Sequence, residues 1–237
     1  MFHVKQSPEG RPERGWEEQL AALTRCLGEL HIPLSQAQAE LLAAYARLVF
    51  SWNRRLNLIA RGDEPVFVRR HVGESLAFAA NRAIRPGAWV LDMGSGAGLP
   101  GIPLKILRPD LHAVLLEAHR RKALFLQEAV EHLGLGDIEV LCARAEYLAT
   151  HHQWQGRFQL VAARAVAPLP KLWLWAAPLL AQEGELLALK GGDLSRELRQ
   201  LGEVDTATVV RVETPPACLV DPSTARVLVT IHRGART

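Results

Sequence analysis

The sequence of 237 residues predicts an α/β fold: a seven-stranded, mostly parallel sheet with helices on both faces, and an N-terminal helical extension packed on this core. Three observations support this fold class. Short apolar runs alternate with helical segments from residue 88 onward, which is typical of a parallel sheet covered on both faces. A glycine-rich turn follows the first of these runs. Hydrophobic residues make up 49% of the chain, which is enough for one large core.

Residues 1–87 are predicted to form the helical extension, and residues 88–237 the core domain. Residues 1–12 contain two prolines and a glycine and are expected to fray. Apolar residues at helical spacing predict helices over Trp16–Leu30, Gln36–Asn57 and Val66–Ala83. Ser35 is a suitable N-cap for the second helix. The segment Arg85-Pro86-Gly87 marks the boundary with the core.

Apolar runs and the breaks between them define the elements of the core. Strands are expected at 88–93, 112–117, 137–142, 158–163, 184–190, 206–213 and 226–232. Helices are expected at 101–108, 119–133, 169–181 and 193–202. No helical segment separates the last two strands, so we expect them to pair antiparallel at one edge of the sheet.

The segment from Asp92 to Gly101 is predicted to be a ligand-binding turn. Four glycines follow the first predicted strand within eight residues, and positions without a Cβ let backbone N–H groups approach a ligand closely. A purely structural turn needs only one or two glycines. The second predicted strand ends in Glu117, a carboxylate placed to accept hydrogen bonds from two ribose hydroxyls. We therefore expect an adenosine-containing cofactor.

Two cofactor classes fit this turn. The stretch Gly96–Gly101 matches the G-x-G-x-x-G pattern of dinucleotide-binding enzymes but contains Pro100, which is unusual in a pyrophosphate cradle. The stretch Asp92–Gly98 reads D-x-G-x-G-x-G and is similar to the first motif of S-adenosylmethionine (SAM) methyltransferases. We favour SAM, with Asp92 facing the ammonium group of its methionine part.

Cysteine content and hydropathy narrow the class of protein further. Cys26, Cys142 and Cys218 are far apart and form no C-x-x-C, so neither a metal site nor a disulfide framework is expected. No stretch resembles a signal peptide, and the longest apolar stretch is interrupted by charged residues and prolines. We expect a cytoplasmic protein with no membrane partner.

The formal net charge is +3, and the excess of basic residues lies before residue 89. Seven arginines fall close together there: Arg54, Arg55, Arg61, Arg69, Arg70, Arg82 and Arg85. They form either a solvated helix face or a phosphate-contacting patch beside the cofactor site. Arg120, Arg121 and Lys122, on the helix after Glu117, have the same two interpretations.

Six strings are distinctive as a set: Trp52-Asn53-x-x-x-Asn57-Leu58, Arg70-His71-x-x-x-Ser75-Leu76, the run from Asp92 to Pro103, Arg144-Ala145-Glu146, Arg164-Ala165-Val166-Ala167 and Leu189-Lys190-Gly191. Together they resemble the glucose-inhibited division protein B family, the bacterial 16S ribosomal RNA guanine-N7 methyltransferases. The similarity covers the chain from the second predicted helix to the last strand. The chain departs from the family at Glu74, where aspartate is usual, and at Ile59, where threonine is usual.

The resemblance implies the Rossmann-like fold of class I SAM-dependent methyltransferases, with SAM as methyl donor, and we expect no metal cofactor. It implies as acceptor a guanine in the decoding region of 16S rRNA, in the small (30S) ribosomal subunit. The family's SAM contacts fall on Gly94, Leu99, Glu117, Ala118, His119, Ala145, Glu146 and Arg164. From the size of the chain we expect a monomer.

The residues around the expected acceptor suit guanine N7. Carbon-5 of a pyrimidine requires a cysteine nucleophile, and no proline–cysteine follows the fourth or fifth strand. Exocyclic amines commonly use an N/D-P-P-Y/F motif after the fourth strand, where this chain reads Arg164-Ala165-Val166-Ala167-Pro168. Guanine N7 has an in-plane lone pair and no proton, so its methylation needs no general base.

Arg164, Lys190 and His71 are the candidate catalytic residues. Arg164 and Lys190 stand at predicted strand ends, where Arg164 would orient SAM or a phosphate and Lys190 would contact the RNA backbone or guanine O6. His71, with Asn57 and Arg70, would form the opposite wall of the acceptor cleft. Each has a structural alternative: loop carbonyls as partners of Arg164 and Lys190, and packing at the helix–sheet junction for His71.

Three other functions fit the sequence less well. The first is a SAM-dependent methyltransferase acting on a small molecule or a protein. The second is a nicotinamide-dependent oxidoreductase, and the third is a non-catalytic SAM-binding or ribosome-assembly protein. The identity of the bound cofactor and the salt dependence of substrate binding discriminate among them.

Overall fold

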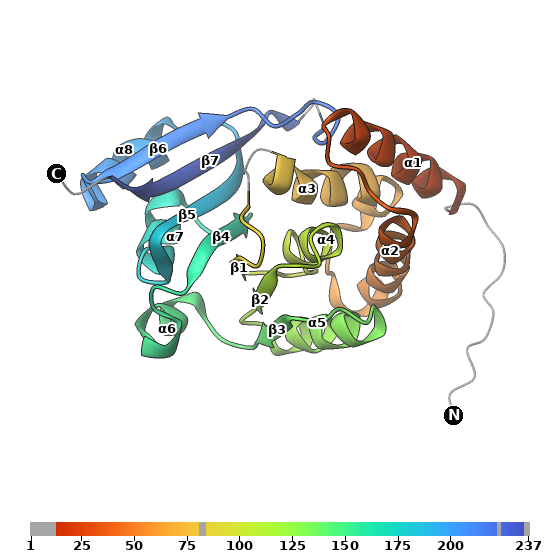
Figure 1. Cartoon of the computed structure of the whole chain (residues 1–237), viewed down its shortest axis with the longest axis horizontal. Coiled ribbons are helices and arrows are strands. Elements are labelled where there is room, and N and C mark those ends of the chain that lie inside the picture. The colour runs from red at the N-terminus through yellow and green to blue at the C-terminus, as the bar shows by residue number, and fades with distance from the viewer. Residues whose placement is uncertain (1–12, 81–83, 222–223, 235–237) are drawn as a thin grey trace.

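The computed structural model describes residues 13–80, 84–221 and 224–234 (Figure 1). The expectation that residues 1–12 fray, the end of the third predicted helix and Arg82 lie outside these residues. The extension begins with α1 (Glu13–Glu29) and α2 (Gln36–Leu56). The predicted N-cap of α2 is confirmed as part of a capping box, in which Ser35 Oγ accepts from Gln38 N at 3.2 Å and Gln38 Oε1 accepts from Ser35 N at 2.9 Å.

The helix predicted over Val66–Ala83 is confirmed as a helical run from Phe67 to Ala80, but it is not one regular α-helix. The structure has a 3₁₀ turn at Arg61–Val66, a π-helical turn at Val68–Val72 and the helix α3 (Gly73–Ala80). Pro65 lies in the 3₁₀ turn, where it supplies no backbone N–H to a continuous helix. The Gly73 N–H reaches the carbonyl of Val68, five residues back, which widens the helix at His71. Such π-helical turns are frequent at functional sites.

The seven predicted strands are confirmed as one sheet in the order β3-β2-β1-β4-β5-β7-β6. The five parallel strands are β1 (Trp89–Met93), β2 (His112–Leu116), β3 (Ile138–Leu141), β4 (Phe158–Arg164) and β5 (Leu180–Gly191). The expected antiparallel pair is also confirmed: β7 (Arg226–Arg233) lies between β5 and β6 (Thr208–Glu213) and is antiparallel to both. Because β1 is central and its neighbours β2 and β4 run parallel to it, their carboxyl ends meet at one edge.

Five helices of the described chain accompany the sheet: α4 (Gly101–Leu107), α5 (Arg120–His132), α6 (Ala145–Thr150), α7 (Leu169–Ala176) and α8 (Ser195–Val204). The sequence did not predict α6, because six residues are too few to show helical periodicity. The helix expected to reach residue 181 ends at Ala176, since Pro178 follows and β5 begins at Leu180.

Alternating residues of the strands enter two hydrophobic clusters, one on each face of the sheet. Val90, Leu115 and Leu160 pack with α4, α5 and the helices of the extension in one cluster. Leu91, Val114 and Val161 pack with α6, α7 and α8 in the other. Figure 1 shows this division, with α1 to α5 on the right of the sheet and α6 to α8 on the left. The extension thus shares its core with one face of the sheet.

A disulfide joins Cys26 of α1 to Cys218, in the segment between β6 and β7. The expectation of no disulfide is therefore wrong for this pair. The two residues are 192 positions apart in sequence, and only the folding of the extension against the β6–β7 segment brings them together. Cys142 is free and exposed. None of the helices in the described part of the chain has the length and apolar character needed to cross a membrane.

Candidate functional site

The glycine turn connects β1 to α4 at the carboxyl edge of the sheet. The N–H groups of Gly94 and Ser95 both donate to the Leu116 carbonyl at the end of β2, at 2.8 and 3.0 Å. A Cβ on Gly94 would lie 2.8 Å from Val166 Cγ2, so the turn packs directly against the segment that follows β4. Gly96 has φ +57 and is partly exposed, and the nearest atom to a Cβ built on it is the Gly94 carbonyl oxygen, at an ordinary van der Waals distance of 3.9 Å. The turn is therefore closed on its protein side and open at Gly96.

Glu117 lies at the end of β2, and its carboxylate is held by two backbone groups. Oε2 accepts from Gly96 N at 2.9 Å, and Oε1 accepts from His119 N at 2.7 Å. Each carboxylate oxygen has a second lone pair, which leaves capacity for two hydroxyl donors. The tether to Gly96 places this capacity beside the open part of the turn.

Asp92 is the second-to-last residue of β1, and its carboxylate is buried. Its Oδ2 accepts from Gly101 N at 2.9 Å, whereas its Oδ1 has no hydrogen-bond partner among the described residues. Burial raises the pKa of Asp92 to about 7, against the lowering effect of the Gly101 N–H. A buried carboxylate oxygen without a hydrogen-bond donor costs folding free energy. The described residues supply no such donor at Oδ1.

The other expected SAM contacts lie along the same edge of the sheet. Leu99 is a buried residue of the glycine turn. Ala118 and His119 form the exposed turn between β2 and α5, and Ala145 and Glu146 begin α6 after β3. Their positions follow β1, β2 and β3 in turn, which is where ligands bind in open α/β sheets. The contacts themselves remain predictions.

Tyr45 of α2 ties the extension to the glycine turn, which the sequence did not indicate. Its fully buried hydroxyl donates to the Ala97 carbonyl at 2.6 Å, and burial raises the pKa of Tyr45 well above its usual value. Tyr45 is one of the apolar residues whose helical spacing predicts the second helix, and its ring is buried. The polar end was missed, because periodicity reports which face of a helix is buried and not which carbonyl lies opposite.

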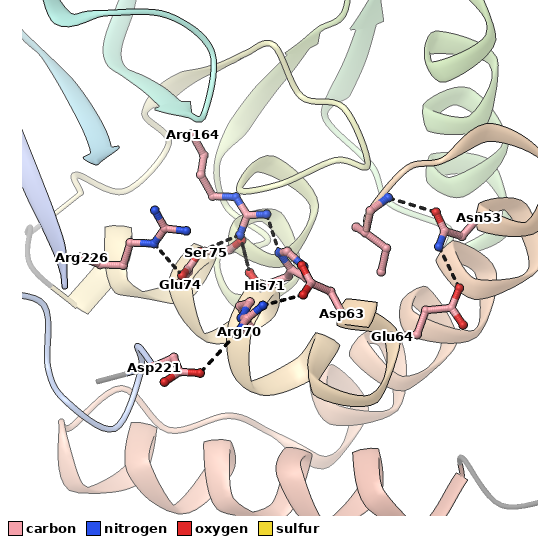
Figure 2. A network of polar contacts seen from close by, with 11 residues as sticks. Asn53, Asp63, Glu64, Arg70, His71, Glu74, Ser75, Arg164, Asp221 and Arg226 are labelled. Atoms are coloured by element: carbon pink, nitrogen blue, oxygen red, sulfur yellow. Dashed lines mark hydrogen bonds and ion pairs between the residues drawn. The ribbon is translucent and has the colours of Figure 1, made fainter. Parts of the chain in front are cut away.

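Arg164 extends from the end of β4 into a polar network built mostly from the extension (Figure 2). Its Nη1 donates to Glu74 Oε2 at 3.0 Å, and its Nη2 lies 2.6 Å from His71 Nδ1. His71 Nε2 in turn lies 2.9 Å from Asp63 Oδ2. The structure thus brings two of the candidate catalytic residues, Arg164 and His71, into direct contact.

Two further residues of the C-terminal part complete the network. Arg226 of β7 donates from Nε to Glu74 Oε1 at 3.1 Å. Asp221 pairs with Arg69 at 3.2 Å and with Arg70 at 3.6 Å, and Arg70 also donates to Asp63 at 2.5 Å. The sequence missed Asp63, Asp221 and Arg226, because each is a single charged residue outside any recognisable string. Glu74 had one signal, its departure from the family's aspartate.

His71 is strongly biased toward its neutral form. Burial is the main cause that lowers its pKa to about 4, and the Arg164 charge adds to this, opposed by Asp63. The side chain is 10% exposed. His71 therefore packs at the junction of extension and sheet, as the structural alternative proposed, and at the same time contacts Arg164.

Lys190 lies apart from the contacts of this network, near the end of β5. Its Nζ donates to the Ala167 carbonyl at 3.2 Å and pairs with Glu197 Oε2 of α8 at 2.8 Å. The same Glu197 oxygen accepts from Leu169 N at 2.7 Å. Lys190 thus holds the segment after β4, as its structural alternative proposed. Whether it also contacts RNA remains a prediction.

The described arginines of the expected basic patch do not all face the glycine turn. Arg85 precedes β1 and pairs with Glu183, near the start of β5, at 2.7 Å. These positions mark the amino-terminal edge of the sheet, opposite the turn. Asn57, expected in the acceptor cleft wall, is the left-handed C-cap of α2.

Comparisons with known proteins match the chain to one family. The family model described as rRNA small subunit methyltransferase G matches residues 38–223. A ribosomal RNA small subunit methyltransferase G from Roseiflexus sp. (strain RS-1) is 40% identical over 207 residues, which are 86% of this chain and 87% of that protein. One from Rubrobacter xylanophilus is 39% identical over 202 residues, covering 85% of this chain and 72% of that protein.

Solved structures with low sequence identity share the fold. A SAM-dependent methyltransferase from Aquifex aeolicus aligns with a TM-score of 0.53 at 16% identity, covering 71% of this chain and 94% of that one. A mutant of MtNAS in complex with S-adenosylmethionine aligns with a TM-score of 0.56 at 13% identity, covering 92% and 89%. These similarities establish the class I methyltransferase fold that the sequence predicted.

Proposed function

The chain belongs to the rRNA small subunit methyltransferase G family, and on this premise we propose that it transfers a methyl group from SAM to N7 of a guanine in the decoding region of 16S rRNA. One observation carries the proposal. Asp92 Oδ1 and the Glu117 carboxylate, both buried, flank an open glycine turn and have unused acceptor capacity. SAM carries an ammonium group and two ribose hydroxyls, which are the donors these two carboxylates lack.

Each residue of the edge has a distinct part in holding the donor. Asp92 accepts from the ammonium of the methionine part, and Glu117 accepts from the ribose hydroxyls. Ala118 and His119 flank the adenine, and Ala145 and Glu146 border its edge. The turn from Gly94 to Leu99 supplies backbone to the methionine part.

For this reaction the protein has mainly to bind and orient the two reactants. SAM supplies an activated methyl group, and guanine N7 supplies the lone pair. Because methylation of N7 places a positive charge on the guanine, a cation against the ring would oppose the reaction. Arg164 therefore acts at the cleft wall on SAM or on an RNA phosphate, and Lys190 at a phosphate or at guanine O6, each at a distance from the ring face.

In this arrangement His71 is a hydrogen-bond partner of Arg164, so proton transfer by His71 is not part of the proposal. The substrate of the reaction is 16S rRNA in the small ribosomal subunit, in the cytoplasm, and we expect the enzyme to act as a monomer. The exposed basic residues Arg120 and Arg121 at the start of α5 suit contacts with RNA phosphates.

The test uses tritiated SAM with 30S subunits, and with naked 16S rRNA, from a strain that lacks the modification. Label at one guanine, removed by borohydride–aniline cleavage at N7-methylated sites, is the expected result. Binding of SAM without transfer to either RNA substrate would contradict the rRNA assignment and favour a small molecule or protein as acceptor. Failure to bind SAM would overturn the proposal as a whole.

A further inference from the structure

The direction of the hydrogen bonds around His71 follows from the chemistry of Arg164. A guanidinium group carries five N–H donors and no acceptor. His71 Nδ1, which lies 2.6 Å from Arg164 Nη2, can therefore take part only as an acceptor. The imidazole then has its single proton on Nε2, and this nitrogen lies 2.9 Å from Asp63 Oδ2. Arg164 donates to His71, and His71 donates to Asp63.

Three elements of the extension supply the partners in this arrangement, two of them to Arg164 directly and one through His71 (Figure 2). Asp63 belongs to the 3₁₀ turn at Arg61–Val66, His71 to the π-helical turn and Glu74 to α3. The Arg164 side chain is 14% exposed, and Glu74, at 2% exposed, accepts from its Nη1. With both terminal nitrogens engaged, the guanidinium is held on two sides.

A ring flip would break the arrangement. Rotation of the imidazole by half a turn would place a carbon where Nδ1 accepts from Arg164, and would leave Nη2 without a partner in a buried position. The carboxylate of Asp63, which accepts from Nε2, favours the same orientation, in which the Nδ1 lone pair faces Arg164. Arg70 donates a hydrogen bond to the other oxygen of this carboxylate, Oδ1.

We propose that Asp63 is a positioning residue for methyl transfer, which fixes the tautomer and orientation of His71 and, through His71, the orientation of the Arg164 guanidinium. The catalytic part of the inference rests on the proposed function, because it takes Arg164 to face the bound donor and acceptor. The hydrogen-bond part does not depend on the identity of the acceptor.

The tautomer can be measured directly. Long-range ¹H–¹⁵N NMR spectra of the full chain with labelled histidine are expected to show His71 neutral, with its proton on Nε2, from pH 5 to 8. In the Asp63→Ala variant this single tautomer should give way to exchange between ring orientations. A proton on Nδ1, or an imidazolium at pH 7, would overturn the inference. This measurement needs no RNA, so it decides the inference even if the protein labels no rRNA.

A pair of amide substitutions separates positioning from packing. In His71→Asn the amide oxygen lies near the former Nδ1 and can still accept from Arg164, whereas in His71→Gln the amide reaches toward Asp63 instead. We expect kcat/KM to fall by about 10- to 100-fold in His71→Gln, the range for a charged hydrogen bond, and by at least about threefold less than that in His71→Asn. Equal losses in both variants would contradict the inference.

Asp63 should act only through His71. We expect Asp63→Ala to lower kcat/KM by about 10-fold or more when His71 is present, and by less than about twofold in the His71→Asn background. Glu64→Ala is the matched control, since Glu64 lies in the same 3₁₀ turn but bonds Asn53. Circular dichroism at the assay temperature would show that each variant is folded. An equal effect of Asp63→Ala in both backgrounds would show that Asp63 acts by another route.

Discussion

Asp92 Oδ2 accepts a hydrogen bond from the backbone N–H of Gly101 at 2.9 Å, which joins the end of β1 to the first residue of α4. A Cβ on residue 101 would lie 2.7 Å from this same oxygen, so only glycine permits the contact. The bond uses one oxygen of the carboxylate and orients the other, Oδ1, which has no partner among the described residues.

This geometry predicts proton-linked binding of SAM. Without SAM the pKa of Asp92 is about 7, and an ammonium group beside Oδ1 would lower it, so binding below pH 7 should release a proton. The groups that act on Asp92 are Arg164, Glu117, Ser95 and the Gly101 N–H. Affinity should rise about fivefold from pH 6 to pH 7. Calorimetry in buffers of different ionisation enthalpy measures the released proton, and Asp92→Asn should abolish it.

Glu74 should be important for stability, because it is the buried partner of two arginines. Glu74→Ala removes the carboxylate that accepts from Arg164 and Arg226, and breaking a buried ion pair in this way costs about 3–5 kcal/mol. Urea unfolding would measure the change. Glu64→Ala, which removes a carboxylate paired only with Asn53 in the contacts described, should cost about 1 kcal/mol. Equal losses would show that Glu74 contributes no more than an ordinary hydrogen bond.

His71 should make the protein less stable in acid. Its pKa is about 4 in the folded protein and 6.5 in its ordinary state, so the unfolded chain binds more protons between these values. The stability that His71 contributes is complete above pH 6.5 and is lost as the pH falls toward 4. The contribution of Asp92 to stability depends on pH in the opposite direction. Its raised pKa favours the folded state at low pH, and this contribution is lost as the pH rises through 7. Urea unfolding of the His71→Asn variant against the unmodified protein isolates the His71 part, and a difference independent of pH would contradict it.

Reduction of the Cys26–Cys218 disulfide should destabilise the protein. A cross-link between residues 192 positions apart restricts the unfolded chain, and disulfides typically contribute about 2–4 kcal/mol. Thermal unfolding with and without a dithiol reductant measures the effect. A Cys26→Ser, Cys218→Ser double variant should match the reduced protein and respond to no reductant. Unchanged unfolding on reduction would show that packing alone holds α1 against this segment.

Lys190→Ala should lower turnover and leave the affinity for SAM nearly intact. Lys190 contacts Ala167 and Glu197, and the glycine turn is not among its described partners. Kinetics with 30S subunits and calorimetry with SAM separate the two effects. Glu197→Ala tests whether Lys190 acts directly or through the segment after β4. An equal loss of turnover in this variant would mean that Lys190 acts by holding that segment. A large loss of SAM affinity in Lys190→Ala would contradict the assignment.

The sequence by itself determined the sheet, the helices around it and the edge at which the site lies. Alternating apolar runs and the glycine turn are local patterns, and strands of one parallel sheet end at a common edge, so Asp92 and Glu117 were placed correctly relative to the turn. The prediction of secondary structure was incomplete where local patterns are weakest. The helix α6 is too short to show a period, and the predicted third helix contains a π-helical turn at Val68–Val72 that apolar spacing does not reveal.

Only the tertiary structure decided the partners of each charged side chain. Arg164 lies 93 positions from His71 and 90 from Glu74 in sequence, and it meets them because the extension packs on one face of the sheet. The disulfide between Cys26 and Cys218 depends on the same packing. A hydrogen bond or a disulfide requires atoms within a few ångströms, and that distance is set by how whole elements pack, which no spacing along the chain encodes. The sequence therefore determined which chemistry the edge can hold, and the packing determined how Arg164 is held there.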